Sequence, residues 1–350
     1  MSQPTLTALG PEGYRNYAVD LRTMAMEPSD HAPEGLLVPG FVDIHIHGAF
    51  GRDFMTGAAE DLLAMADGLV EVGYEAFLPT TVTGSLEDVR RAISHLPVAD
   101  WRIEGFHLEG PFISPKHPGA QPQKYIIEPS AEWDNVLDHR QLRVVTLAPE
   151  IEGGIELIER LAWRGLPDFD LDTVTVSLGH TDATYAQVRE AVAAGARHTT
   201  HTYNAMRPLH HREAGTVGAA LLLPELTCEL IYDRIHVSRP AAEVLLRSKG
   251  PNGVIAVSDA TMAAGMEPGS EITMWGLDCT VGEGEVRLKD GTLAGSAITL
   301  YDAFRNLAFD FGMETAIRLC CLNPRRALSM GNPRTWTIMD PDFKIVQILS

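Results

Sequence analysis

The stretch LLVPGFVDIHIHG, residues 36–48, ends an apolar, β-rich run with two histidines, His45 and His47. Side chains two residues apart on a strand point to the same side, so both imidazoles can bind one metal ion. Taken alone, the pair could equally be two buried or solvated histidines, because short motifs often arise by chance. The pair becomes informative because acidic residues and histidines recur at the ends of later strand-like runs.

Seven further strand-like runs alternate with stretches of helical spacing, which is typical of parallel βα units. With the first run, residues 36–47, the predicted strands are 74–80, 103–109, 143–148, 173–180, 196–201, 226–232 and 253–259; helical spacing is clear over 58–72, 151–163 and 184–194. Polar residues end the strands all round the series. This favours an α/β fold of the (β/α)8 TIM-like type over an open doubly wound sheet, with the active site at the carboxyl ends of the strands.

The two chain ends depart from the barrel pattern. Residues 1–35 and 331–350 are predicted to form a small β-rich annex, and residues 36–330 the catalytic barrel. The strand-like tail, residues 336–349, should pair with the N-terminal segment. The family resemblance described below implies a longer chain after Met330, which leaves the completeness of the annex open.

An insertion interrupts the end of the barrel. Residues 267–294 form short, glycine-punctuated alternating pieces, which predict an inserted hairpin or lid. Helices are expected over 297–311 and 313–322, and the dipeptide Asn323-Pro324 should break the pattern.

Composition narrows the class of protein. The 350 residues are 45% hydrophobic and 21% charged, as in ordinary globular proteins, and contain no apolar run of the roughly 20 residues that a membrane span requires. The formal net charge of −19 repels phosphate backbones and anionic lipids, so we expect neither nucleic acid nor membrane as a partner. The first residues lack a secretory pattern, which predicts a cytoplasmic location. The four cysteines have no C-x-x-C spacing and are expected to be reduced thiols.

Three further residues at strand ends form a plausible metal-binding set. Glu109, His180 and His201 follow predicted strands three, five and six. One carboxylate and two imidazoles leave a coordination position open for water on a metal such as zinc. Singly, each residue has an ordinary explanation, as a surface acid or a hydrogen-bonded core histidine. Together, on one barrel, they favour a metal centre.

Asp259 ends the eighth predicted strand, after the apolar residues Val254-Ile255-Ala256-Val257. Its carboxylate could bind a metal or accept a proton from an attacking water. The alternative role is capping of the next helix. The apolar strand before it favours catalysis.

The order of these motifs resembles that of the N-acetylglucosamine-6-phosphate deacetylases of the amidohydrolase superfamily. The resemblance covers about Val38 to Leu328, and its motifs are H-x-H, H-L-E-G-P-F, G-H-T-D-A-T, H-T-Y-N-A-M, Ile235-His236-Val237 and V-S-D-A-T. The combination is far more specific than any single motif. It implies hydrolysis of the acetyl group of N-acetylglucosamine 6-phosphate, yielding glucosamine 6-phosphate and acetate.

The resemblance also implies a divalent metal, one or two ions per subunit, with zinc favoured and iron, manganese or cobalt as alternatives. The implied first site is Glu109, His180 and His201, and the implied second site is His45, His47 and Asp259. Asp259 is implied as general base and then general acid.

For the sugar phosphate, the resemblance implies recognition by Asn204, the backbone at Ala205, Arg212 and His236. It further implies a homodimer in which phosphate-binding residues are shared across the interface. Read from the sequence alone, Arg212 could instead be a solvated loop charge. Gln121 stands where many members of the family have a histidine, so its amide can donate a hydrogen bond to substrate but cannot titrate near neutrality.

Three alternatives remain open. The substrate could be the epimer N-acetylgalactosamine 6-phosphate. A cyclic amidohydrolase or deaminase is disfavoured in its dihydroorotase form, because Thr146-Leu147-Ala148-Pro149-Glu150 offers no lysine on strand four. The third alternative is a catalytically inactive, metal-stabilised protein that binds sugar phosphates.

Overall fold

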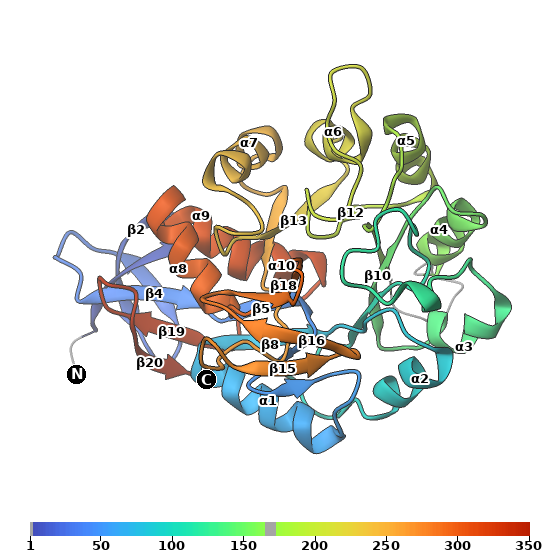
Figure 1. Ribbon diagram of the computed structural model, residues 1–350. Helices are drawn as coiled ribbons and strands as arrows, with labels where there is room; N and C mark the ends of the chain where they lie inside the picture. The colour runs from blue at the N-terminus through green and yellow to red at the C-terminus, as the bar shows by residue number, and fades with distance from the viewer. Residues whose placement is uncertain (1–2, 165–172) are drawn as a thin grey trace.

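The computed structural model describes residues 3–164 and 173–350, and its centre is a ring of parallel strands (Figure 1). Residues 1–2 and 165–172, which fall within the predicted annex and barrel ranges, lie outside the described residues. The eight strands of the ring are β5 (Phe41–Ile46), β8 (Tyr74–Pro79), β9 (Phe106–Glu109), β10 (Leu142–Leu147), β11 (Thr175–Leu178), β12 (His198–Thr199), β13 (Thr227–Ile231) and β14 (Val254–Val257).

Pairing closes these strands into a barrel. Strands β9 to β14 form one parallel sheet in sequence order, and β5 pairs in parallel with β8. Parallel bridges join β8 to β9 at Thr80 and His107, and the end of β5 to Ala260 after β14. The predicted (β/α)8 barrel is therefore confirmed.

Helices cover the outside of the barrel (Figure 1). They are α1 (Ala59–Glu71), α2 (Leu86–Ser94), α3 (Asp134–Leu137), α4 (Gly154–Trp163), α5 (Tyr185–Ala194), α6 (Gly215–Leu222), α7 (Arg239–Lys249) and α8 (Leu300–Phe311). Local sequence sets their starts: Thr184 accepts a hydrogen bond from the backbone of Gln187, and Thr299 does the same for Asp302. Each pair forms a capping box, which satisfies backbone donors at the first turn.

A small apolar cluster fills part of the ring. Its members come from five barrel strands, and side chains from opposite strands can meet only inside the ring. They are Val42, Ile44, Leu78, Val144, Ile231, Ile255 and Val257, joined by Leu328. This packing gives the strand ends a rigid base.

The prediction of one continuous strand over residues 36–47 is wrong. It consists of β4 (Gly35–Pro39), which belongs to the annex, and β5, which belongs to the barrel. The chain passes between them at Gly40, where an added Cβ would lie 2.2 Å from Thr335 Oγ1 and 2.6 Å from Glu75 Cβ. The side chains of Thr335 and Glu75 therefore leave no room for a Cβ at this crossing, which explains the glycine.

The annex is a six-stranded sheet in the order β20-β19-β4-β1-β2-β3. Its other strands are β1 (Thr5–Gly10), β2 (Gly13–Asp20), β3 (Ala25–Pro28), β19 (Trp336–Met339) and β20 (Ile345–Leu349). The strand-like tail joins the same sheet as the N-terminal strands, but it does not pair directly with residues 1–35: β19 runs antiparallel to residues 36–39 of β4, which we had assigned to the barrel. The division into annex and barrel at residues 35/36 and 330/331 stays a prediction, and β4 extends across the first of these boundaries.

Glu75, at the start of β8, ties the annex to the barrel. Its buried carboxylate accepts hydrogen bonds from Arg325 Nη1 at 2.8 Å, from Arg334 N at 2.9 Å and from Thr335 N at 3.0 Å. Burial would raise the pKa of Glu75, but hydrogen bonds from Arg325 and the backbone lower it below its usual value. The carboxylate is therefore ionised and paired.

The insertion is larger than a hairpin. It is a four-stranded antiparallel sheet of β15 (Glu271–Met274), β16 (Leu277–Val281), β17 (Glu285–Leu288) and β18 (Leu293–Ser296), which we call the inserted sheet. Ser296 N donates to the carbonyl of Asp259 at 3.2 Å, and Thr261 N donates to the carbonyl of Ser296 at 3.0 Å. These bonds dock the sheet beside the end of β14.

The prediction that the helical pattern breaks at Asn323-Pro324 is wrong. Helix α9 (Met313–Ile317) continues through one π-helical stretch, Arg318–Leu322, into α10 (Asn323–Ala327). Pro324 is the second residue of α10, directly after the π-helical stretch, and its fixed φ suits a helix. Within residues 3–164 and 173–350, no helix combines the length and apolar character that crossing a bilayer requires.

Candidate active site

The predicted metal ligands all lie at the carboxyl ends of barrel strands. His45 belongs to β5 and His47 follows it, Glu109 ends β9, and His180, His201 and Asp259 each lie two residues beyond their strands, β11, β12 and β14. The last three have positive φ angles of 47°, 30° and 48°. Residues other than glycine rarely adopt this backbone conformation, and such backbone strain is concentrated at functional sites.

The first predicted ligand set is compact and buried. Glu109 Oε1 lies 3.3 Å from His180 Nε2 and 3.1 Å from His201 Nε2, and the two nitrogens are 3.0 Å apart. The three side chains are at most 6% exposed. One ion could contact all three ligand atoms.

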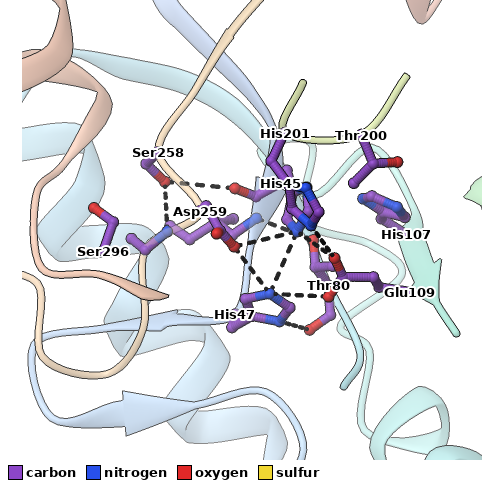
Figure 2. A network of polar contacts seen from close by, with 12 residues as sticks. His45, His47, Thr80, His107, Glu109, Thr200, His201, Ser258, Asp259 and Ser296 are labelled. Atoms are coloured by element: carbon purple, nitrogen blue, oxygen red, sulfur yellow. Dashed lines mark hydrogen bonds and ion pairs between the residues drawn. The ribbon is translucent and has the colours of Figure 1, made fainter. Parts of the chain in front are cut away.

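The second predicted set, His45, His47 and Asp259, is also compact, and Glu109 of the first set lies against it. His45 Nε2 and His47 Nε2 are 3.3 Å apart, and Asp259 Oδ1 lies 3.3 Å from the former and 3.2 Å from the latter. Glu109 reaches the same nitrogens, with its Oε1 3.4 Å from His45 and its Oε2 3.4 Å from His47. Figure 2 shows the side chains of His45, His47, Glu109, His201 and Asp259 pointing toward one another.

Hydrogen bonds to the far ring nitrogens fix how two of the imidazoles face this cluster. His180 Nδ1 lies 3.0 Å from the carbonyl of His117, and His47 Nδ1 lies 3.1 Å from that of Thr80. A carbonyl only accepts, so each Nδ1 carries the proton and each Nε2 turns a lone pair inward. Lone pairs and carboxylates converging at this range fit a cation: two ligands of a tetrahedral zinc ion, each about 2.1 Å from it, lie about 3.4 Å apart.

The charges lead to the same conclusion. Burial would raise the pKa of Glu109, but His45 and the neighbouring imidazoles lower it well below its usual value. Burial would likewise raise the pKa of Asp259, but His45 and His47 lower it to about 2. The pKa of His45, which burial would lower, is raised well above its usual value by Glu109, Asp259 and Glu229. Three buried carboxylates around one histidine need positive charge, which a divalent ion supplies.

Glu229, in the middle of β13, is a residue that our sequence reasoning missed. Its fully buried Oε2 accepts from the His45 ring, 3.0 Å from Nδ1, and from the backbone N–H of His201, also at 3.0 Å. One carboxylate thus holds a ligand of each predicted metal site. The available signal was the glutamate inside the apolar run Cys228–Tyr232, since glutamate is almost never fully buried without a partner.

Gln121 lies beside the cluster in a different way from the one we expected. Its Nε2 donates to Glu109 Oε2 at 2.6 Å, and its Oε1 accepts from the backbone of Thr83 at 2.7 Å. Both ends of the amide are therefore engaged within the protein. Gln121 lines the cavity, but its bonds orient Glu109, and its predicted bond to substrate would have to replace one of them.

A cavity of about 280 Å3 opens above the cluster. Asn204, Ala205 and His236 line it, as does Gln121. His236 Nδ1 lies 2.5 Å from the buried Asp233 Oδ2, a bond that fixes the ring. The inserted sheet adds a wall that the sequence did not predict by residue: Trp275 and the segment Thr292–Gly295.

The structure does not bring Arg212, a predicted site residue, to the lining of this cavity. It lies in an exposed loop between β12 and α6, with Nη1 2.7 Å from His211 Nε2. The same loop exposes more than half of the Leu209 side chain. The role of Arg212, like the roles of the other predicted residues, stays a prediction.

Comparison with known proteins agrees with this architecture. The model of the Amidohydrolase family matches residues 36–333. The N-acetylglucosamine-6-phosphate deacetylase of Lysinibacillus sphaericus is 37% identical over 308 residues, which cover 85% of this chain and 77% of that protein. The N-acetylgalactosamine-6-phosphate deacetylase of Escherichia coli O157:H7 is also 37% identical, over 84% of this chain and 78% of that protein.

A solved structure extends the agreement to the whole chain. The crystal structure of N-acetylglucosamine-6-phosphate deacetylase from Thermotoga maritima superposes with a TM-score of 0.88 at 31% identity, covering 100% of this chain and 98% of that chain. The family match, the relatives and the solved structure all agree with the barrel fold. The chain therefore belongs to the amidohydrolase family of hydrolases.

Proposed function

We propose that this hydrolase removes the acetyl group of N-acetylglucosamine 6-phosphate, giving glucosamine 6-phosphate and acetate in amino-sugar catabolism. The observation that carries the proposal is the buried cluster of six ligand-type side chains at the base of a cavity. It occurs in a chain that shares 37% identity with relatives named as deacetylases of this substrate class.

Metal binding is part of the proposal. Glu109, His180 and His201 would hold one divalent ion, and His45, His47 and Asp259 a second, with Glu109 lying between them. A bound ion would lower the pKa of a water molecule and polarise the acetyl carbonyl. Imidazole and carboxylate ligands suit zinc best, with iron, manganese and cobalt as alternatives.

Asp259 is the proposed proton carrier. Its carboxylate, with a pKa of about 2, is ionised at neutral pH and lines the cavity. It accepts a proton as water oxygen bonds to the acetyl carbon. It then delivers that proton to the nitrogen as the C–N bond breaks, so the amine leaves neutral together with acetic acid, which loses its remaining proton to the solvent as acetate.

The remaining residues divide between orientation and sugar recognition. Thr80 and His117 fix two imidazoles through their carbonyls, and Glu229 fixes a third. His236 and Asn204, which line the cavity, would bind the sugar phosphate. The phosphate anion suits an imidazole ring that Asp233 already orients.

We further propose a homodimer in which Arg212 of one subunit reaches the phosphate in the other. The support is its placement: Arg212 lies away from its own cavity, in a loop that exposes Leu209 and projects from the barrel before α6 (Figure 1). The planar guanidinium suits phosphate oxygens. A cytoplasmic location completes the proposal, because a charged sugar phosphate does not cross a bilayer unaided.

N-acetylgalactosamine 6-phosphate remains the second candidate substrate, because a relative named for that activity is as similar as those named for the first. The two sugars differ in the orientation of one hydroxyl. Parallel kinetics with both sugars decide between them.

The test is acetate release by the metal-loaded protein from N-acetylglucosamine 6-phosphate, with the unphosphorylated sugar and the Asp259→Asn variant alongside. We expect release that depends on the phosphate and falls about 10²- to 10⁴-fold in Asp259→Asn, the usual contribution of a general acid–base group. A folded, metal-bound protein that releases no acetate from either epimer would refute the proposal and favour the inactive binding protein.

A further inference from the structure

Trp275 occupies an unusual position at the cavity. It lies at the turn between β15 and β16 of the inserted sheet, with a φ of 54°, and is followed by Gly276 with a φ of 82°. A left-handed backbone is unfavourable for a bulky residue, so surrounding contacts must hold it. The indole lines the cavity.

A partly buried hydrogen bond holds the indole in place. Trp275 Nε1 donates to Asp53 Oδ2 at 3.0 Å. The other oxygen of Asp53 accepts from the backbone N–H and from the hydroxyl of Thr56, both at 3.1 Å. Asp53 belongs to β7 (Arg52–Asp53), close after His47, so the bond fastens the inserted sheet to the metal-ligand end of the barrel.

The ring borders the place where the chemistry is proposed to occur. The indole and the His47 imidazole pack edge to face, with centroids 5.5 Å apart and planes at 72°. His47 Nε2 lies 3.2 Å from Asp259 Oδ1, the proposed proton carrier. Ala120, Leu293 and Ala294 add apolar surface to the same cavity.

The geometry points to Trp275 as the wall of an acyl pocket that limits the substrate to short acyl groups, above all acetyl. This inference rests on the proposed function. The acyl carbonyl must reach the buried cluster, and the sugar phosphate must extend toward polar groups such as His236 and Asn204. The acyl chain then points away from the sugar, toward the apolar wall, and each added methylene meets a fixed indole ring.

Acyl-chain selectivity tests the inference. The ratio of kcat/KM for the N-propionyl and N-butyryl substrates to that for N-acetylglucosamine 6-phosphate would be measured for wild type, Trp275→Phe and Trp275→Ala. Trp163→Ala, which removes an exposed tryptophan of α4, is the matched control. One extra methylene in a hydrophobic pocket changes kcat/KM by about 10- to 200-fold. We therefore expect the kcat/KM of wild type for the N-butyryl substrate to be at least about 10-fold lower than for the N-acetyl substrate.

We expect Trp275→Ala to raise the ratio of N-butyryl to N-acetyl kcat/KM at least about 10-fold, toward one. Trp275→Phe should raise this ratio by a smaller factor, and Trp163→Ala should leave it unchanged. If Trp275→Ala does not fold, Trp275→Phe alone carries the test. An unchanged ratio in a folded Trp275 variant, or a wild type that cleaves N-butyryl as well as N-acetyl, overturns the inference. Failure of wild type to release acetate would instead refute the proposed function.

Discussion

Replacing Glu229 should weaken metal binding although Glu229 is not itself a proposed ligand. The Glu229→Gln variant keeps an oxygen that can accept from His45 and His201 but removes a fully buried negative charge. Residues that orient metal ligands typically contribute 10- to 100-fold in metal affinity, or about 1.4 to 2.7 kcal/mol. We expect a loss in this range, concentrated at the ion that His45 would bind.

Glu229→Ala should be worse, because it also leaves the buried N–H of His201 without its acceptor. An unsatisfied buried donor costs about 1–3 kcal/mol, and the deleted side chain adds a cavity. The free energy of unfolding of the metal-free protein should therefore fall by at least about 2 kcal/mol in Glu229→Ala, and by less in Glu229→Gln.

The assay is metal content by mass spectrometry during titration with a competing chelator, together with urea unfolding of the metal-free protein. Glu225→Gln, which removes the same charge from an exposed position just before β13, is the matched control and should bind metal as wild type does. Two ions retained by Glu229→Gln with wild-type affinity would refute the reasoning.

Three further predictions follow from buried carboxylates. Gln121→Ala removes the 2.6 Å hydrogen bond to Glu109 and should lower metal affinity about 10-fold. The control Gln123→Ala, at a neighbouring exposed position, should leave metal affinity unchanged. Equal chelator titrations of Gln121→Ala and wild type would contradict this prediction. Glu75→Gln leaves Arg325 buried without its partner charge and should lower the free energy of unfolding by about 3–5 kcal/mol with metal content unchanged, as thermal melts and metal analysis can show. The pKa of Asp259 falls from 3.8 to about 2 on folding, so its ionised form stabilises the metal-free fold above about pH 4, and about 2 kcal/mol is lost as pH falls from 4 to 2. Urea titrations in that window should show a shallower loss in Asp259→Asn than in wild type, and parallel pH curves would contradict the assignment.

The sequence predicts most of the barrel because parallel strands buried on both faces are continuously apolar, as in Val254–Val257. The same rule fails at residues 36–47, where a second sheet begins within one apolar run. The division of the run shows only in three dimensions, where β4 pairs with β1 and β19 in the annex and β5 pairs with β8 in the barrel. Pro324 was misjudged because a proline is equally suited to starting a helix and to following one.

For the candidate site, spacing and strand position are enough to bring six side chains together, because all barrel strands present their carboxyl ends to one face. The positions of Glu229 and Trp275 could not be obtained in the same way. Glu229 acts from inside a strand on side chains of other strands, and Trp275 comes from an insertion whose placement depends on its bond to Asp53. The proposed role of Arg212 in phosphate binding depends on a second subunit, which the sequence of one chain does not place.

The position of β4 in the annex has a consequence for the synthesis of the protein. β4 is flanked by β1, from the beginning of the chain, and by β19, from its end, and only Gly40 separates β4 from the strand that bears His45. During translation, that strand emerges from the ribosome long before residues 336–339 exist to pair with its neighbour. A nascent chain, or one cut before residue 336, therefore has the first histidines of the cluster attached to a half-paired sheet, and their final anchoring depends on residues that are made much later.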